Sequence, residues 1–135
     1  QWLAANNATL ERTSNAIAAI LSKVPGLKVN PIGGAFYMMP LFEDGVLNDR
    51  QFLPAATPEA AALVEGAVSE PGFPLDKRFA FHLLASTGIC VVPASDFECP
   101  WPGFRVTTLE RDEARLERTY AAIAKAIGQY LASGG

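Results

Sequence analysis

Two amphipathic patterns with helical spacing stand at the two ends of the sequence, and they constrain the fold more than any other feature. The first predicts a helix over residues 3–24, ended by Pro25-Gly26, whose apolar face is formed by Leu10, Ile17, Ile20, Leu21 and Val24. The second predicts a helix that begins near Arg111 and has the apolar face Leu116, Tyr120, Ile123, Ile127 and Leu131. Each apolar face must be buried, so the residues between the two helices have to supply the surface that both cover.

Four short apolar runs between these helices predict that this surface is a small sheet. They are residues 27–31, 35–41, 89–92 and 104–109. Gly33-Gly34 indicates a tight turn or bulge between the first two runs, and the β-branched run 89–92 suits an interior strand. We therefore expect the α/β class, as an α+β sandwich in which helices cover a small mixed or antiparallel sheet.

A third helix is predicted over residues 74–87. Proline suits a first helical turn, Asp76 there interacts favourably with the helix dipole, and Gly88 is placed to act as the C-terminal cap. The buried stripe of this helix would be Phe79, Leu83 and Leu84. The chain's only histidine, His82, lies within this helix, so we expect it at the edge of the core or on the surface.

The length of 135 residues, half of them hydrophobic, predicts one domain over residues 1–135. Residues 43–74 contain four prolines and no sustained periodicity except for a short helical stretch at 58–68, so we interpret them as a surface insertion. The chain starts with Gln1, inside the first helical pattern, and we expect it to be a fragment of a longer protein.

Composition excludes several classes of function. A net charge of −3 without a run of Lys or Arg argues against a nucleic-acid partner. No apolar stretch approaches the roughly 20 residues that span a bilayer, and the N-terminus lacks the pattern of a signal peptide. Cys90 and Cys99 form neither a disulfide framework nor a metal quartet, so we expect no metal and a cytoplasmic location.

Arg105 is the candidate binding residue. Because a strand alternates its faces, Phe104, Val106 and Thr108 would point toward the helices while Arg105 points away from the core. A guanidinium on a rigid strand presents a planar pair of donors that matches a carboxylate, which a lysine cannot do. By itself, an arginine on a strand is more often a solvated or salt-bridged surface residue.

Three segments in order along the chain resemble a known family. Residues 24–40 (VPGLKVNPIGGAFYMMP) are similar to the small-domain strand motif of class I/II aminotransferases of fold type I, and of alanine aminotransferases in particular. Residues 83–97 are similar to the helix, strand and loop that lead to the active site in that family. Residues 101–109 (WPGFRVTTL) resemble the strand whose arginine binds the substrate α-carboxylate. The chain departs from the family pattern at Ala94-Ser95-Asp96, which adds an acid near the active-site loop.

The resemblance implies that this chain is the C-terminal small domain of a pyridoxal-phosphate enzyme. In the full-length homodimer, Arg105 would bind the substrate carboxylate. The enzyme would move an amino group between an amino acid, with alanine as the first candidate, and a 2-oxo acid such as 2-oxoglutarate or pyruvate. The Schiff-base lysine and the cofactor site belong to an N-terminal large domain. None of the four lysines, Lys23, Lys28, Lys77 and Lys125, has the family's sequence context, so we predict no catalytic residue in this chain and no activity of the isolated fragment.

Two alternatives remain open on the sequence. The chain could be a stand-alone α/β module that binds a small acid or a protein and does no chemistry. It could also belong to another fold type I activity, such as a different transaminase, a β-lyase or a decarboxylating synthase, since these share the carboxylate arginine.

Overall fold

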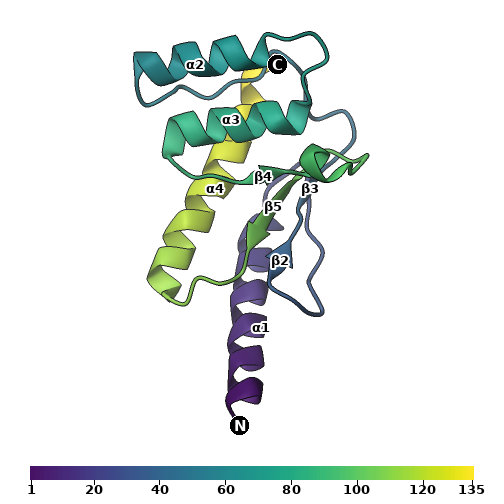
Figure 1. The fold of residues 1–135 in the computed structure, drawn as a ribbon, viewed down its shortest axis with the longest axis vertical. Helices are drawn as coiled ribbons and strands as arrows, with labels where there is room; N and C mark the ends of the chain where they lie inside the picture. Colours follow the sequence, from purple (N-terminus) through teal and green to yellow (C-terminus); the bar gives the residue numbers. More distant parts are fainter.

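The computed structural model describes residues 1–135 and combines four α-helices with two small sheets (Figure 1). In chain order the elements are α1 (Trp2–Leu21), β1 (Leu27–Lys28), β2 (Tyr37–Met38), β3 (Leu41–Phe42), α2 (Pro58–Val68), α3 (Leu75–Thr87), β4 (Val92–Pro93), the 3-10 helix η1 (Ala94–Phe97), β5 (Phe104–Thr107) and α4 (Glu113–Ser133). The predicted class, small antiparallel sheets covered by helices, is confirmed.

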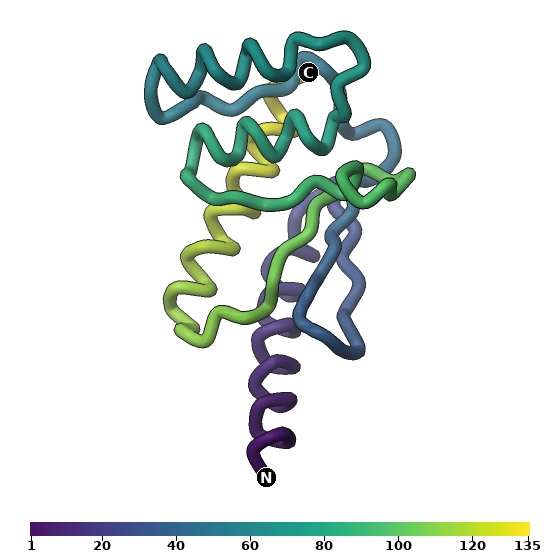
Figure 2. The backbone as a smooth tube through the Cα atoms, in the orientation of Figure 1, coloured from purple at the N-terminus to yellow at the C-terminus, as the bar shows by residue number.

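The helices form two packed pairs. α1 packs against α4, and α2 packs against α3 at the end of the molecule where the chain terminates (Figure 1). The first turns of α1 extend beyond the rest of the chain, as the tube in Figure 2 shows. None of the helices has the length and apolar composition that a membrane span requires.

β5 is the central strand of a three-stranded antiparallel sheet with the order β2-β5-β4. Its register places Arg105 opposite Val92 of β4. β1 and β3 form a separate antiparallel pair, and a bridge between Leu41 and Gly103 connects this pair to the start of β5. The strand that carries Arg105 is therefore paired on both sides and also held by the bridge just before its first residue.

The structure corrects the sheet prediction at residues 89–92. This run is not an interior strand, because β4 begins only at Val92, lies at the edge of the sheet, and leaves Cys90 exposed. Pro93 has no N–H to offer a further strand, which suits an edge position. Residues 27–31 and 35–41 flank a bend at Gly33-Gly34 as predicted, but 35–41 divides into β2 and β3, which belong to different sheets.

An aromatic cluster fills the centre of the core. Phe79 is fully buried on α3, and its ring centroid lies 5.2 Å from those of Phe42 and Tyr130 and 5.6 Å from that of Phe104. The cluster thus joins α3, α4, β3 and β5. Phe104 is its contribution from the strand that carries the next residue, Arg105.

The buried faces of α3 and α4 agree with the predicted stripes except at their margins. α4 buries four of the five predicted residues, Leu116, Tyr120, Ile123 and Ile127, together with Tyr130, which was not predicted. On α3, Phe79 and Leu83 are fully buried, but Leu84 is 46% exposed, so that part of the prediction is wrong. Leu84 lines an apolar groove between α2 and α3 that is open to solvent.

Residues 43–74 are anchored to the rest of the chain rather than loose. They contain α2, with the bounds predicted, and the Thr57 hydroxyl caps this helix by accepting a hydrogen bond from the Ala60 N–H at 3.2 Å. Gln51 is buried and donates its side-chain amide to the Val46 carbonyl at 2.8 Å, while Leu53 belongs to the main core. That residues 43–74 are a surface insertion stays a prediction.

His82 makes the stability of this chain depend on pH. Its side chain is 7% exposed, and its Nδ1 accepts a hydrogen bond from the Leu53 N–H at 3.3 Å. Burial, and next the positive charge of Arg78, lower the pKa of His82 from its usual 6.5. The unfolded chain therefore takes up a proton before the folded chain does. The contribution of neutral His82 is fully present above about pH 6.5 and is lost as the pH falls below that value toward the lowered pKa.

Urea unfolding between about pH 7.5 and about pH 5 checks this prediction, with His82→Asn as the matched variant. Asparagine can accept the Leu53 N–H through its side-chain oxygen but cannot take up a proton. The free energy of unfolding should fall less steeply with pH in the variant than in the wild type. The same slope in both proteins would show that another group causes the pH dependence.

Candidate functional site

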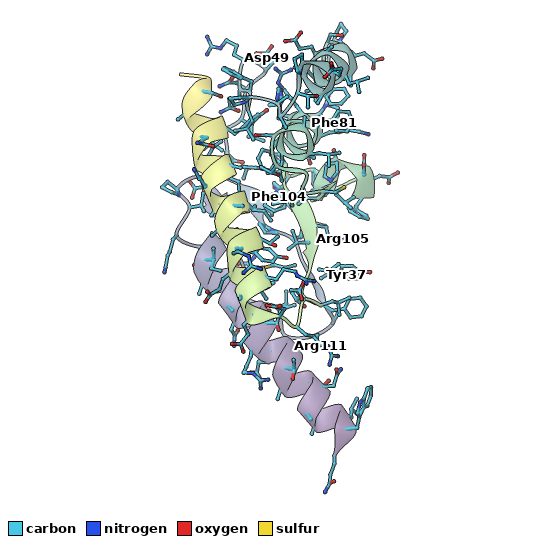
Figure 3. All side chains as sticks on the ribbon, turned by 90° about the vertical axis from the view of Figure 1, so that its left-hand side faces the viewer. Tyr37, Asp49, Phe81, Phe104, Arg105 and Arg111 are labelled. Carbon is cyan, nitrogen blue, oxygen red and sulfur yellow. The ribbon has the colours of Figure 1, made fainter.

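Strand alternation places Arg105 as predicted. Phe104, Val106 and Thr108 are buried on one side of β5, whereas Arg105 is half-buried and its neighbour Thr107 is exposed. Arg105 and Tyr37 lie on the side of the sheet away from α4 (Figure 3). Because Arg105 sits on the central strand, the strand around it is paired with β2 on one side and with β4 on the other.

The guanidinium of Arg105 lies between two aromatic rings. Its central carbon is 4.5 Å from the ring centroid of Tyr37 and 4.3 Å from that of Phe97. Tyr37 comes from the neighbouring strand β2, and Phe97 from η1. Cation–π attraction to both rings holds the group in place. The orientation of Arg105 is therefore fixed by two side chains that the sequence did not single out.

The hydrogen-bond donors of Arg105 are available. The N–H groups of a guanidinium lie in its plane, and in Arg105 none of them donates a hydrogen bond to another residue or pairs with a carboxylate of the chain. Tyr37 and Phe97 are each 41% exposed, so the site is open to solvent. An oriented guanidinium edge of this kind suits a two-point hydrogen bond to a carboxylate.

The acid at the departure from the family pattern does not compete for Arg105. Asp96 pairs with Lys77, whose Nζ lies 3.1 Å from the Asp96 Oδ1, on the surface of the molecule. The added charge near the loop is therefore balanced by a neighbouring lysine, and the guanidinium of Arg105 keeps its donors for a ligand.

Gly103, two residues before Arg105, is required by a close approach between β5 and β3. A Cβ atom at this position would press against the Pro40 carbonyl oxygen and lie 2.7 Å from Leu41 Cδ2. The same Pro40 carbonyl accepts a hydrogen bond from the Phe104 N–H at 3.0 Å. Backbone atoms cannot move aside as the end of a flexible side chain can, so the strands would have to separate.

We expect Gly103→Ala to lower the free energy of unfolding by about 1–3 kcal/mol or more. Gly128→Ala on α4 is the matched control, since nothing lies within 4 Å of a Cβ there, and alanine favours a helix over glycine. Denaturant unfolding measures both. A Gly103→Ala protein as stable as the Gly128→Ala protein would contradict the close approach.

The lysines of this chain do not make a pyridoxal-phosphate site. Lys23, Lys28 and Lys125 are exposed on separate elements, and Lys77 is paired with Asp96. None of the four lines a cavity with Arg105. Residues 1–135 therefore do not form a binding site for pyridoxal phosphate by themselves, and no chemical step of the cofactor can be assigned to residues of this chain.

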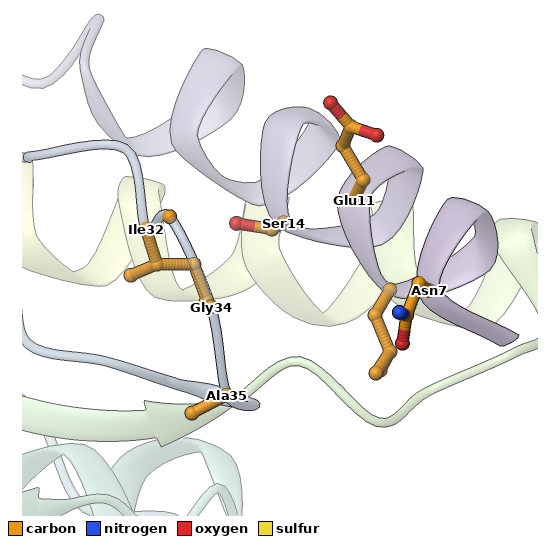
Figure 4. A pocket seen from close by; sticks show the side chains of 8 residues that line it. Asn7, Glu11, Ser14, Ile32, Gly34 and Ala35 are labelled. Atoms are coloured by element: carbon orange, nitrogen blue, oxygen red, sulfur yellow. The ribbon is translucent and has the colours of Figure 1, made fainter. Parts of the chain in front are cut away.

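A separate hollow lies between α1 and residues 32–35, away from Arg105 (Figure 4). Its volume is about 510 Å³, and its polar side chains are those of Asn7, Glu11 and Ser14. It contains no cationic residue, and Arg105 does not line it. A carboxylate would find no positive charge there, so Arg105 with Tyr37 and Phe97 is the candidate site.

The known proteins that resemble this chain in sequence and in structure are named as aminotransferases. No protein-family profile matches the chain. An uncharacterised aminotransferase of Methanocaldococcus jannaschii is 36% identical over 131 residues, which are 97% of this chain and 30% of that protein. Human alanine aminotransferase 1 is 36% identical over 78 residues, which are 58% of this chain and 12% of that protein. The crystal structure of the aspartate aminotransferase from Rhizobium meliloti superposes with a TM-score of 0.71 at 25% identity, over 96% of this chain and 28% of that one. The chain thus spans less than a third of each relative.

Proposed function

Since the chain is homologous to the C-terminal region of aminotransferases, we propose that it is the substrate-carboxylate-binding small domain of a pyridoxal-phosphate-dependent aminotransferase. The observation that carries this proposal is the geometry of Arg105, whose guanidinium lies over the rings of Tyr37 and Phe97 with its donors unpaired. That arrangement suits the one group that amino acids and 2-oxo acids share, the α-carboxylate.

The proposed reaction moves an amino group from alanine to a 2-oxo acid such as 2-oxoglutarate. A relative from Dictyostelium discoideum named probable alanine aminotransferase, at 32% identity, and human alanine aminotransferase 1, at 36%, support alanine as the donor. Arg105 accommodates the carboxylate of either substrate, because both bind to the same site in turn. The rest of each substrate extends beyond the residues of this chain.

The contribution of this chain to the reaction is positioning. A two-point hydrogen bond from Arg105 fixes the carboxylate and the direction in which the Cα–H bond points, and such orientation can supply several kcal/mol of barrier reduction. Tyr37 and Phe97 prevent the guanidinium from swinging with the substrate. Pyridoxal phosphate supplies the electron sink for such reactions when it is bound. Its site, and the lysine that would carry it, are proposed to lie outside residues 1–135.

The proposal includes partners of the chain. We propose an N-terminal large domain, a cytoplasmic homodimer when the protein is full length, and an isolated fragment without activity. The coverage of only 30% of the Methanocaldococcus jannaschii relative supports further residues in the parent protein. The exposure of Tyr37 and Phe97 beside Arg105 supports a site that a second domain completes.

Formation of pyruvate from L-alanine and 2-oxoglutarate tests the function. The full-length protein should catalyse it and carry the absorbance of pyridoxal phosphate, and the 135-residue chain should do neither. An active, cofactor-loaded preparation of the short chain would contradict the division of roles. A full-length protein inactive with a panel of amino acids and 2-oxo acids would contradict the function itself.

A further inference from the structure

Asp76 is a buried carboxyl group outside the site described above. It lies in the first turn of α3 and is only 2% exposed, although the sequence pattern suggested a simple helix-dipole role. A buried carboxyl group is costly unless hydrogen-bond donors surround it. The donors around Asp76 therefore indicate what the group is for.

Four donors meet the two oxygens of Asp76. The Oδ1 atom accepts hydrogen bonds from the Lys77 N–H at 2.8 Å and from the Ser95 hydroxyl at 2.7 Å. The Oδ2 atom accepts from the Ser95 N–H at 2.9 Å and from the Gly103 N–H at 3.4 Å. Three of these four donors belong to segments outside α3, so Asp76 joins η1 and the entry to β5 to the start of the helix.

Both joined segments lead directly to the candidate site. Ser95 is two residues before Phe97, whose ring stacks on the guanidinium, and Gly103 is two residues before Arg105. Residues 98–103, which connect η1 to β5, have no regular secondary structure apart from a bridge at Gly103. The ladder between β4 and β5 fixes the backbone of Arg105. That ladder does not fix the position of Phe97, the last residue of the η1 turn that Asp76 holds through Ser95.

We propose that Asp76 is a positioning residue, whose buried carboxyl group holds the Ser95 turn and Gly103 so that Phe97 meets Arg105 and the guanidinium edge is aimed at the substrate carboxylate. This inference rests on the proposed function. It assigns Asp76 no contact with substrate or cofactor; its effect passes through Phe97 and Arg105.

Steady-state kinetics of the full-length protein with L-alanine and 2-oxoglutarate test the proposal. Asp76→Ala removes all four hydrogen bonds, and we expect KM for both substrates to rise about tenfold while kcat changes less than about threefold, because displacement of a positioning group weakens binding. Asp76→Asn is the conservative variant. Its oxygen can accept from the Ser95 and Gly103 N–H groups while its amide donates to the Ser95 hydroxyl. Only the bond from the Lys77 N–H, within α3 itself, is lost, so KM should stay within about threefold of the wild type.

Thr57→Ala is the matched control for lost stability. It removes the cap of α2, whose hydrogen bond from the Ala60 N–H involves no residue of the site, and so it lowers stability without touching the site. KM should not change in this variant. Ser95→Ala removes one donor to Asp76 and should raise KM about threefold, which keeps the test valid if Asp76→Ala does not fold.

Two results separate the failure of this inference from failure of the function. If Arg105→Ala raises KM but a folded Asp76→Ala protein, or in its absence Ser95→Ala, has the wild-type KM, the positioning role is wrong and the proposed function stands. If Arg105→Ala also leaves KM unchanged, the carboxylate site itself is wrong.

Discussion

Arg105→Ala in the full-length protein is expected to raise KM for both L-alanine and 2-oxoglutarate by about 10²-fold, the cost of removing one partner of a hydrogen-bonded charge pair. The effect should be similar for the two substrates, because the carboxylate is the group they share. The absorbance of bound pyridoxal phosphate should survive, since Arg105 is not proposed to hold the cofactor.

Two other arginine variants control this experiment. Arg105→Lys keeps the charge but loses the planar pair of donors, and it should recover only part of the affinity. Arg111→Ala removes an exposed arginine six residues further along the chain, whose guanidinium donates to Asn6 Oδ1 at 2.8 Å, and it should leave KM unchanged. Wild-type kinetics in Arg105→Ala, or full activity in Arg105→Lys, would contradict a two-point carboxylate bond.

Phe79→Ala should have the largest effect on stability, a loss of about 3–5 kcal/mol. The ring is fully buried and lies at the centre of the cluster with Phe42, Phe104 and Tyr130, so its removal leaves a cavity bounded by both helices and strands. A domain of this size is stable by only about 5–15 kcal/mol, so the variant approaches the unfolding threshold.

Denaturant unfolding followed by circular dichroism measures this loss. Phe81→Ala is the control on the same helix, because Phe81 is only partly buried and its ring contacts that of Phe73 at 5.6 Å rather than the central cluster. Phe81→Ala should lower the free energy of unfolding clearly less than Phe79→Ala does. Equal losses in the two variants would show that the cluster around Phe79 is not the centre of the core.

Local patterns predicted the elements of this fold well. The periodicity of α4 identified Leu116, Tyr120, Ile123 and Ile127 as buried, and strand alternation gave the correct faces of Phe104 and Arg105. The C-terminal cap at Gly88 is confirmed by its left-handed backbone, with φ of 75°. These features depend on neighbours within a few residues, which a single sequence contains.

Features that depend on distant partners were beyond such patterns. Tyr37 and Phe97 are 60 residues apart in the sequence, and nothing local indicates that both reach Arg105. Asp76 was interpreted from its own helix, whereas its partners Ser95 and Gly103 come from elsewhere in the chain. Spacing also could not show that residues 89–92 would meet only one neighbouring strand.

A crystal structure of the full-length protein with 2-methylalanine, which lacks the Cα hydrogen and cannot be transaminated, tests the central claim most directly. Both carboxylate oxygens should lie about 2.7–2.9 Å from nitrogens of the Arg105 guanidinium, with the rings of Tyr37 and Phe97 still beside it. A carboxylate bound by another residue, with Arg105 free or paired within the protein, would contradict it.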